Sequence, residues 1–186
     1  MSQLYIPVLL GTGREGRQSE KVAKFVLAEA QQFGFSSELY DVRDYGSAVT
    51  VPSWVANPRA GKWREMVKKA NGLIMVMPEY NHSYPGEFKL VLDSLNKEYA
   101  GLPVGLCTVS SGPFGGARMV ENLLPVLQYL QMVAVPSMVH FASVQTVFNE
   151  QGELIDAAYR ERVQKLFASL KTYAQVLAPL RASTGV

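Results

Sequence analysis

Short apolar runs alternate along this chain with longer segments whose apolar residues recur at helical spacing. The short runs are typical of buried strands and occupy residues 5–10, 37–42, 73–77, 104–109 and 138–141. The longer segments are typical of helices and cover residues 19–33, 62–71, 87–96, 117–131 and a C-terminal region around 163–177. Right-handed crossovers place such helices on both faces of a parallel sheet. The alternation therefore predicts an α/β fold with three layers, a doubly wound sheet of five parallel strands.

Length and composition fit one compact domain, which is predicted to span residues 1–186. The net charge is +2, with lysines and arginines spread along the predicted helices, which argues against nucleic acid as a partner. The single cysteine, Cys107, lies in an apolar strand, so we expect a core position and a reducing compartment. Because the N-terminus has no leader-like pattern and no apolar run is long enough to span a membrane, we expect a cytoplasmic protein without a membrane partner.

The predicted helices carry four features that a structure can test. Ser19 is placed to cap the first helix, and Gly34 to end it. Pro125 is expected to kink the helix over 117–131. That helix is apolar around much of its circumference, which suggests a subunit interface that includes Leu123, Leu124, Leu127, Tyr129 and Leu130. For Trp54 and Trp63, packing is favoured over covering a ligand pocket.

Ligands of doubly wound sheets bind outside the carboxyl ends of the strands, so the loops after the first, third and fourth strands are the informative ones. The first loop, residues 11–19, contains Gly-x-Gly-x-x-Gly, which is typical of dinucleotide binding, with Asp41 then available for a ribose. Its polar side chains fit a terminal phosphate better, because hydroxyl, guanidinium and helix N–H groups suit a dianion. The candidate phosphate ligands are Thr12, Arg14, Arg17, Gln18 and Ser19. A plain solvated turn is the alternative.

The loop after the third strand, residues 77–86, places rigid Pro78 and Pro85 around polar and aromatic groups. Such a loop suits a planar heterocycle, whose edge Asn81 and the backbone N–H groups would bind. Glu79 and Tyr80 line the same loop, and for Glu79 a bracing role is favoured, because a carboxylate beside an electron-rich ring is unfavourable unless it is hydrogen-bonded elsewhere.

The loop after the fourth strand, residues 110–116, is again polar and rich in glycine. Glycines let backbone N–H groups approach a ligand edge closely, where they stabilise developing negative charge. The alternative is an ordinary turn between strand and helix. Three such loops at one sheet edge are harder to explain as turns than any single one.

The three loop motifs occur in the order and spacing of a known family. Gly11-Thr-x-Arg14 with Ser19, Pro78-Glu-Tyr-Asn81 with Pro85-Gly86, and Ser110-Ser-Gly-x-x-Gly-Gly116 together resemble the NADPH-dependent FMN reductase family, which includes azoreductases, quinone reductases and chromate reductases. The resemblance covers roughly residues 4–145. It implies a flavodoxin-like sheet of order 2-1-3-4-5, FMN at the strand ends, and a homodimer or homotetramer.

The resemblance also implies a site. Thr12, Arg14 and Ser19 would hold the FMN phosphate, with either Arg17 or Gln18 adding a contact because residues 15–18 lengthen this loop. The isoalloxazine ring would lie between one wall made of Pro78, Glu79, Tyr80 and Asn81 and another made of Ser110, Ser111, Gly112, Gly115 and Gly116.

The function implied is an NAD(P)H oxidoreductase in which FMN carries the chemistry, so no catalytic side chain is expected. NADPH or NADH would reduce FMN, and a quinone, azo compound, flavin or metal ion would then reoxidise it in a ping-pong cycle. No metal-ligand spacing occurs around His82, His140 or Cys107. The alternatives are a flavodoxin-type electron carrier, which the slightly basic charge disfavours, and a non-catalytic flavin sensor.

Overall fold

The computed structural model describes residues 3–46, 50–55 and 57–183. Both ends of the predicted domain lie outside these ranges, and so do the first two residues of the N-terminal segment that was expected not to be a leader. The strands are β1 (Val8–Leu10), β2 (Leu39–Asp41), β3 (Leu73–Pro78), β4 (Pro103–Val109), β5 (Val133–Ala134) and β6 (Val139–Phe141). The α-helices are α1 (Ser19–Gln32), α2 (Pro58–Lys69), α3 (Gly86–Leu92), α4 (Ala117–Tyr129) and α5 (Ala158–Ser183). Short 3-10 helices cover Val42–Asp44, Lys97–Tyr99 and Val144–Thr146.

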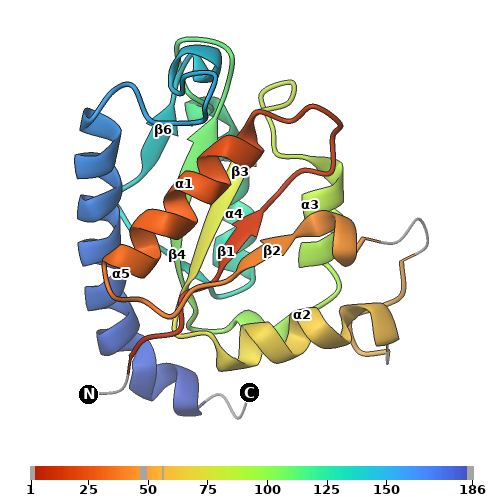
Figure 1. Ribbon diagram of the computed structural model, residues 1–186. Helices are drawn as coiled ribbons and strands as arrows, with labels where there is room; N and C mark the ends of the chain where they lie inside the picture. The colour runs from red at the N-terminus through yellow and green to blue at the C-terminus, as the bar shows by residue number, and fades with distance from the viewer. Residues whose placement is uncertain (1–2, 47–49, 56, 184–186) are drawn as a thin grey trace.

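The strands form one parallel sheet in the order β2-β1-β3-β4-β5, which confirms the predicted α/β fold and strand order. β6 adds to the same edge, because it pairs in parallel with the carboxyl-terminal half of β4 while β5 pairs with its start. The predicted fifth strand is therefore confirmed at β6, and the two-residue β5 is an addition. Figure 1 shows the sheet at the centre with helices on both sides.

Each face of the sheet carries its own hydrophobic cluster. The apolar residues of α1 and α5, such as Val22, Val26 and Leu166, pack with β1, β3 and β6 on one face. On the other face, α2, α3 and α4 cover β3 and β4, with Trp63 and Phe88 fully buried. These two clusters make the three layers and confirm the packing role expected of Trp63.

Several element boundaries differ from the expectation for local reasons. β1 begins at Val8 because Pro7 has no N–H to donate to a sheet ladder. α2 begins earlier than predicted, at Pro58, whose ring suits the first helical turn, and Asn57 caps it by accepting from the Arg59 N–H at 3.1 Å. α4 continues through Pro125 to Tyr129.

The predicted cap of α1 is wrong. Ser19 is the first residue of the helix rather than its cap, and its buried Oγ makes no hydrogen bond. Gln18 occupies the capping position without a side-chain bond. Gly34 does end the helix region, with φ +100°. The N-terminus of α1 therefore keeps an unused hydroxyl at the carboxyl edge of the sheet.

Two further observations concern the described part of the chain as a whole. No helix in it is both long and apolar enough to cross a membrane. Cys107 is fully buried in β4, and this burial raises the pKa of its thiol, as expected of a core residue without nucleophilic function.

Candidate functional site

The loop after β1 is tied to β3 and α3 through Thr12. A Cβ on Gly11 would collide with the Met77 side chain, so glycine lets the loop begin close to the end of β3. Thr12 is fully buried, and its hydroxyl donates to Glu87 Oε1 at 2.7 Å while lying 3.0 Å from the Tyr80 hydroxyl. The structure thus gives Thr12 a bracing contact, and its predicted phosphate bond would have to compete with it.

Glu87, in the first turn of α3, is the acceptor that organises this loop. Its carboxylate also accepts from the Gly13 N–H at 2.8 Å. Burial alone would raise its pKa, but hydrogen bonds from its own backbone N–H, from Thr12 and from Gly13 outweigh burial and hold the pKa of Glu87 below its ordinary value. No loop motif in the sequence pointed to Glu87; the available signal was an acidic residue in the first turn of a helix that begins at the site.

Arg17 folds back under its own loop. Its side chain is 5% exposed, its Nη1 donates to Asp41 Oδ1 at 2.9 Å, and its Nη2 contacts the other carboxylate oxygen. The same guanidinium bonds Glu20 and the carbonyl of Thr12. Asp41 raises the pKa of Arg17. The pKa of Asp41 is in turn lowered, because hydrogen bonds from Arg17 and the Arg43 N–H outweigh the opposing effect of burial.

This pairing changes the expectation for two residues. The donors of Arg17 are already bonded to groups of the protein. The exposed Gln18 is therefore better placed than Arg17 to bind a phosphate. Asp41 is occupied by Arg17 and is therefore a poor partner for a ribose, which counts against the dinucleotide interpretation of the glycine loop.

A cavity of about 360 Å³ opens where the loops after β1, β3 and β4 meet. This volume falls within the usual range of small-molecule sites, about 300–1,000 Å³. The predicted site residues that line the cavity are Arg14, Arg17, Gln18, Ser19, Pro78, Glu79, Tyr80, Ser110 and Ser111. The remaining predicted residues, Thr12, Asn81, Gly112, Gly115 and Gly116, are not among those that line it. Val144 also lines the cavity, and no motif in the sequence pointed to it.

Two buried side-chain oxygens in the described residues lack a hydrogen-bond partner, Ser19 Oγ and Glu79 Oε2. Both residues line this cavity. Among the described residues, the Glu79 carboxylate makes no hydrogen bond to the loop that it begins, so its side-chain contacts do not support the bracing role expected of it. Since buried polar groups are nearly always paired, two unpaired groups in one cavity indicate a place where a ligand supplies the partners.

The residues present fit FMN. A hydroxyl without a partner lies at the uncapped N-terminus of α1, which is the kind of site that a phosphate occupies. Arg14 lies at the rim and extends over the Tyr80 ring, with its guanidinium carbon 5.3 Å from the ring centroid. A phosphate-binding site at one end and an aromatic and polar wall at the other match the phosphate and the ring of a flavin mononucleotide.

The loop after β3 turns sharply beside the cavity. Tyr80 and Ser83 exchange backbone hydrogen bonds of 2.8 and 2.9 Å, and the two residues between them, Asn81 and His82, have φ values of +50° and +63°. Positive φ at both central positions is typical of a type I′ turn, and Asn and His are among the non-glycine residues that adopt it most often. The turn is held from α4, where Asn122 donates to the His82 carbonyl at 2.7 Å. The exposed Asn81 amide is therefore set on a fixed backbone.

Close packing explains why glycines occupy positions 115 and 116 after β4. A Cβ on Gly115 would lie 2.8 Å from the His140 backbone, and one on Gly116 would lie 2.9 Å from Thr108 Cβ. Thr108 donates to the Gly115 carbonyl at 2.6 Å and contacts His140 Nδ1 at 2.6 Å, so His140 has a structural role in this loop. Both glycines, with positive φ, let the loop fold down onto β4 and β6 and leave Ser110 and Ser111 at the cavity.

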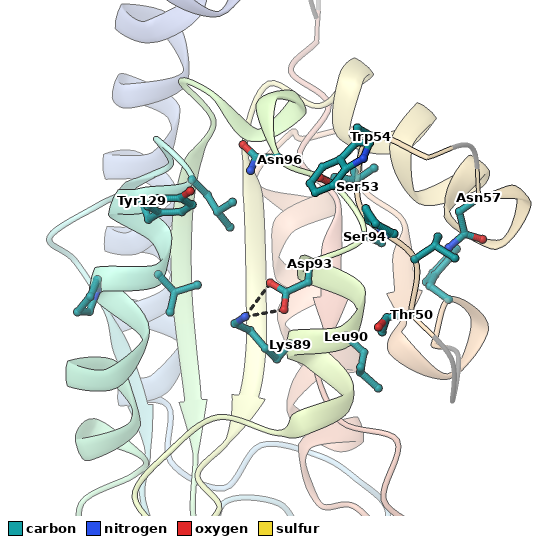
Figure 2. A pocket seen from close by; sticks show the side chains of 17 residues that line it. Thr50, Ser53, Trp54, Asn57, Lys89, Leu90, Asp93, Ser94, Asn96 and Tyr129 are labelled. Atoms are coloured by element: carbon teal, nitrogen blue, oxygen red, sulfur yellow. Dashed lines mark hydrogen bonds and ion pairs between the residues drawn. The ribbon is translucent and has the colours of Figure 1, made fainter.

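A larger hollow of about 760 Å³ lies elsewhere, between the C-terminal parts of α3 and α4. Figure 2 shows Tyr129 and Trp54 on opposite sides of it, with the ion pair of Lys89 and Asp93 between them. Trp54 is 85% exposed and Tyr129 is 77% exposed, so the packing role expected of Trp54 is wrong. Because the helices run back toward the amino ends of the strands, this hollow is separate from the loop cavity.

Comparisons with known proteins agree with this geometry. The model of the family described as NADPH-dependent FMN reductase matches residues 4–146. The chain belongs to this family. The assignment predicted from the three loop motifs is thus confirmed, and the chain is an oxidoreductase by family. The matched region includes all three loops and ends with the segment that carries Val144, whereas α5 lies beyond it.

Individual relatives are consistent with membership of the FMN reductase family. An NAD(P)H-dependent FMN reductase of Pseudomonas aeruginosa is 30% identical over 64% of this chain and 68% of its own length. A quinone reductase of Escherichia coli is 35% identical, but the alignment spans only about half of each chain, 50% and 52%. An NADPH azoreductase of a Bacillus species is 26% identical over 91% of this chain and 94% of its own.

Solved structures of low sequence identity share the fold. The flavoenzyme NAD(P)H:(acceptor) oxidoreductase FerB of Paracoccus denitrificans superposes with a TM-score of 0.75, at 18% identity, over 92% of this chain and 97% of its own. A flavodoxin of Streptococcus pneumoniae superposes with a TM-score of 0.56, at 17% identity, over 91% and 98%. The flavodoxin-like prediction for the sheet is thereby confirmed for this member of the FMN reductase family.

Proposed function

We propose that this protein binds FMN in the loop cavity and catalyses electron transfer from NADPH or NADH to small-molecule acceptors. The observation that carries the proposal is that Ser19 Oγ and Glu79 Oε2, both buried without a partner, line the same cavity at the carboxyl edge of the sheet. Membership of the FMN reductase family supports FMN as the ligand that fills it.

The residues of the chain position the cofactor. Ser19, with Gln18 and the first N–H groups of α1, would bind the phosphate, and Arg14 would neutralise it from the rim. Arg17 and Asp41 keep the loop in place underneath. Ser110 and Ser111, which precede a rigid glycine turn, would bind the ribityl chain or the ring edge opposite Tyr80.

When bound, FMN would supply the redox chemistry, which is hydride transfer from NAD(P)H and then electron transfer to a second substrate, and we propose a ping-pong order. Quinones, azo compounds, free flavins and metal ions are the proposed acceptors, the first two because curated relatives include a quinone reductase and an azoreductase. Hydride transfer requires no proton donor or acceptor from the protein, so no catalytic side chain is assigned.

A flavodoxin-type carrier or a flavin sensor would have the same fold but would not oxidise NAD(P)H directly. The net charge of +2 does not provide the acidic surface by which such carriers are steered to protein partners. The charge and the family therefore favour the enzyme over the carrier.

The experiment is an anaerobic visible spectrum of the purified protein saturated with FMN, before and after one equivalent of NADPH, and separately of NADH. Bleaching of the flavin bands within seconds supports the reductase and ranks the two donors. Bound flavin that stays oxidised would leave a carrier or sensor. Failure to bind FMN would contradict the proposal altogether.

We also propose that the protein assembles as a homodimer or homotetramer through the surface between α3 and α4. Exposed apolar side chains line the hollow there, including Leu90, Tyr129 and Trp54. On α4, Leu123 and Leu127 face the core while Leu124 and Tyr129 face outward, which explains the apolar circumference seen in the sequence. Covering this patch by a second copy would remove its contact with water.

A further inference from the structure

Glu79 differs from the other enclosed carboxylates described in this structure. Its backbone N–H donates to the Val109 carbonyl at 3.0 Å, which fixes the residue at the end of β3. Its Oε2 is shielded from solvent and has no hydrogen-bond donor. Among the described residues, no ion pair includes Glu79.

Other buried or half-buried glutamates in this structure have hydrogen-bond donors that Glu79 Oε2 lacks. Glu29 accepts from Arg160 at 2.8 Å and from Gln164 at 3.2 Å. Glu98 accepts from Arg64 at 2.9 Å, and Glu87 accepts from Thr12 and Gly13. Glu79 is half-buried, and a shielded carboxylate oxygen without a donor adds nothing to the stability of the fold, so hydrogen bonding within the protein does not account for a glutamate at position 79.

We propose that Glu79 is a redox-tuning residue, whose negative charge lowers the reduction potential of the FMN that this cavity holds. The inference rests on the proposed function. Reduction adds electron density to the flavin ring, and a fixed negative charge in the same cavity wall disfavours that form relative to the oxidised one. The two arginines that line the same cavity do not cancel this charge, because Arg17 is paired with Asp41 and Arg14 lies exposed over Tyr80.

This role gives the reduced cofactor more driving force toward its acceptors. A lower potential makes reduced FMN a stronger reductant, which widens the range of acceptors that it can reduce. The charge weakens binding of reduced FMN more than binding of oxidised FMN, and the ratio of the two dissociation constants measures the effect without any turnover.

The test compares wild-type protein with Glu79→Gln, which keeps the size of the side chain and removes its charge. The matched control is Glu15→Gln, the same substitution at an exposed residue of the same cavity, where solvent screens the charge. Dissociation constants are measured anaerobically by titration with oxidised FMN and with chemically reduced FMN. For Glu79→Gln the ratio of reduced to oxidised constants should fall about tenfold, as expected for a charge acting across a few ångströms of protein. For Glu15→Gln it should change less than about twofold.

Thermal unfolding without FMN provides the second measurement. Because Oε2 has no partner to lose, Glu79→Gln should be as stable as the wild type or more stable. An unchanged ratio of constants in Glu79→Gln, or a clear loss of stability that identifies Glu79 as a brace, would overturn the inference. Failure of the wild-type protein to bind FMN would instead contradict the proposed function, so the two failures are distinguishable.

Discussion

The guanidinium of Arg17 and the carboxylate of Asp41 form a two-point ion pair that joins the loop after β1 to the end of β2. The two residues are 24 positions apart, and the pair holds the glycine loop in the shape that leaves Ser19 at the cavity. The shape of the cofactor site thus depends on a contact that the protein makes with itself.

Breaking this pair should weaken both fold and site. In Asp41→Asn the enclosed guanidinium loses the more buried of its two charged partners and keeps only Glu20, which should lower the free energy of unfolding by about 1–3 kcal/mol and raise the FMN dissociation constant about tenfold. Urea unfolding and flavin titration measure the two effects. Asp44→Asn, an exposed acid on the adjacent turn, is the control and should change neither. Equal behaviour of the two variants would show that the pair does not hold the loop.

Ser19→Ala and Ser37→Ala should have opposite effects. The Ser19 hydroxyl has no partner in the protein, so its removal should leave stability unchanged while FMN affinity falls about tenfold. The Ser37 hydroxyl donates to the Ile6 carbonyl at 2.6 Å far from the cavity, so its removal should cost about 1 kcal/mol of stability without changing FMN affinity. Tight FMN binding by Ser19→Ala would remove Ser19 from the phosphate site.

Glu87→Gln should make the stability of the protein less dependent on pH in the acidic range. The pKa of Glu87 is lowered in the folded state, so its contribution to stability is complete above its unfolded pKa of about 4.3 and is lost as pH falls through the lower folded value. At neutral pH the variant should be less stable by about 1–2 kcal/mol, because an amide accepts from Thr12 and Gly13 less strongly.

Urea unfolding of both proteins at pH 7 and at about pH 3 tests this linkage. The difference between wild type and Glu87→Gln should shrink in acid, because the wild-type carboxylate is then increasingly protonated. A difference that stays constant with pH would mean that the charge of Glu87 does not contribute to stability.

Two substitutions of Asn81, in the turn after β3, distinguish the contribution of its amide to FMN binding from the contribution of its backbone conformation to stability. Asn81→Gly keeps a residue that accepts φ +50°, whereas Asn81→Ala adds a conformational cost of about 1 kcal/mol. Both variants should bind FMN more weakly than wild type or be reduced more slowly by NADPH, but only Asn81→Ala should unfold at a lower temperature. If Asn81→Gly binds FMN and is reduced like the wild type, the amide is not part of the site.

If the apolar surface between α3 and α4 is a subunit interface, a charged side chain placed on it should disrupt the oligomer. Tyr129→Glu should lower the mass measured by light scattering at micromolar concentration without affecting secondary structure. Val176→Glu is the matched control, because Val176 is 71% exposed on α5 and lies outside this surface. A wild-type protein that is already monomeric, or a Tyr129→Glu variant that keeps the full mass, would contradict the proposed interface.

Periodicity along the sequence predicted the fold well because it reports burial. The run Leu73–Pro78 is buried at every position, as a central parallel strand requires, and the helical spacing of Val22, Val26 and Ala30 places one face of α1 on the sheet. Short edge strands were harder. β5 has two residues, and nothing in its local pattern distinguishes it from the turn that surrounds it.

By itself, the sequence determined the α/β architecture, the strand order through a family resemblance, and the three loops that meet at one sheet edge. The partners of the side chains in those loops were decided by the tertiary structure alone. Arg17 is turned inward by Asp41, Thr12 is engaged by Glu87, and Glu79 is left without a donor. The physical reason is that hydrogen bonding depends on distances between residues far apart in the chain, which strand register and helix packing fix, whereas periodicity reports only which face of an element is buried.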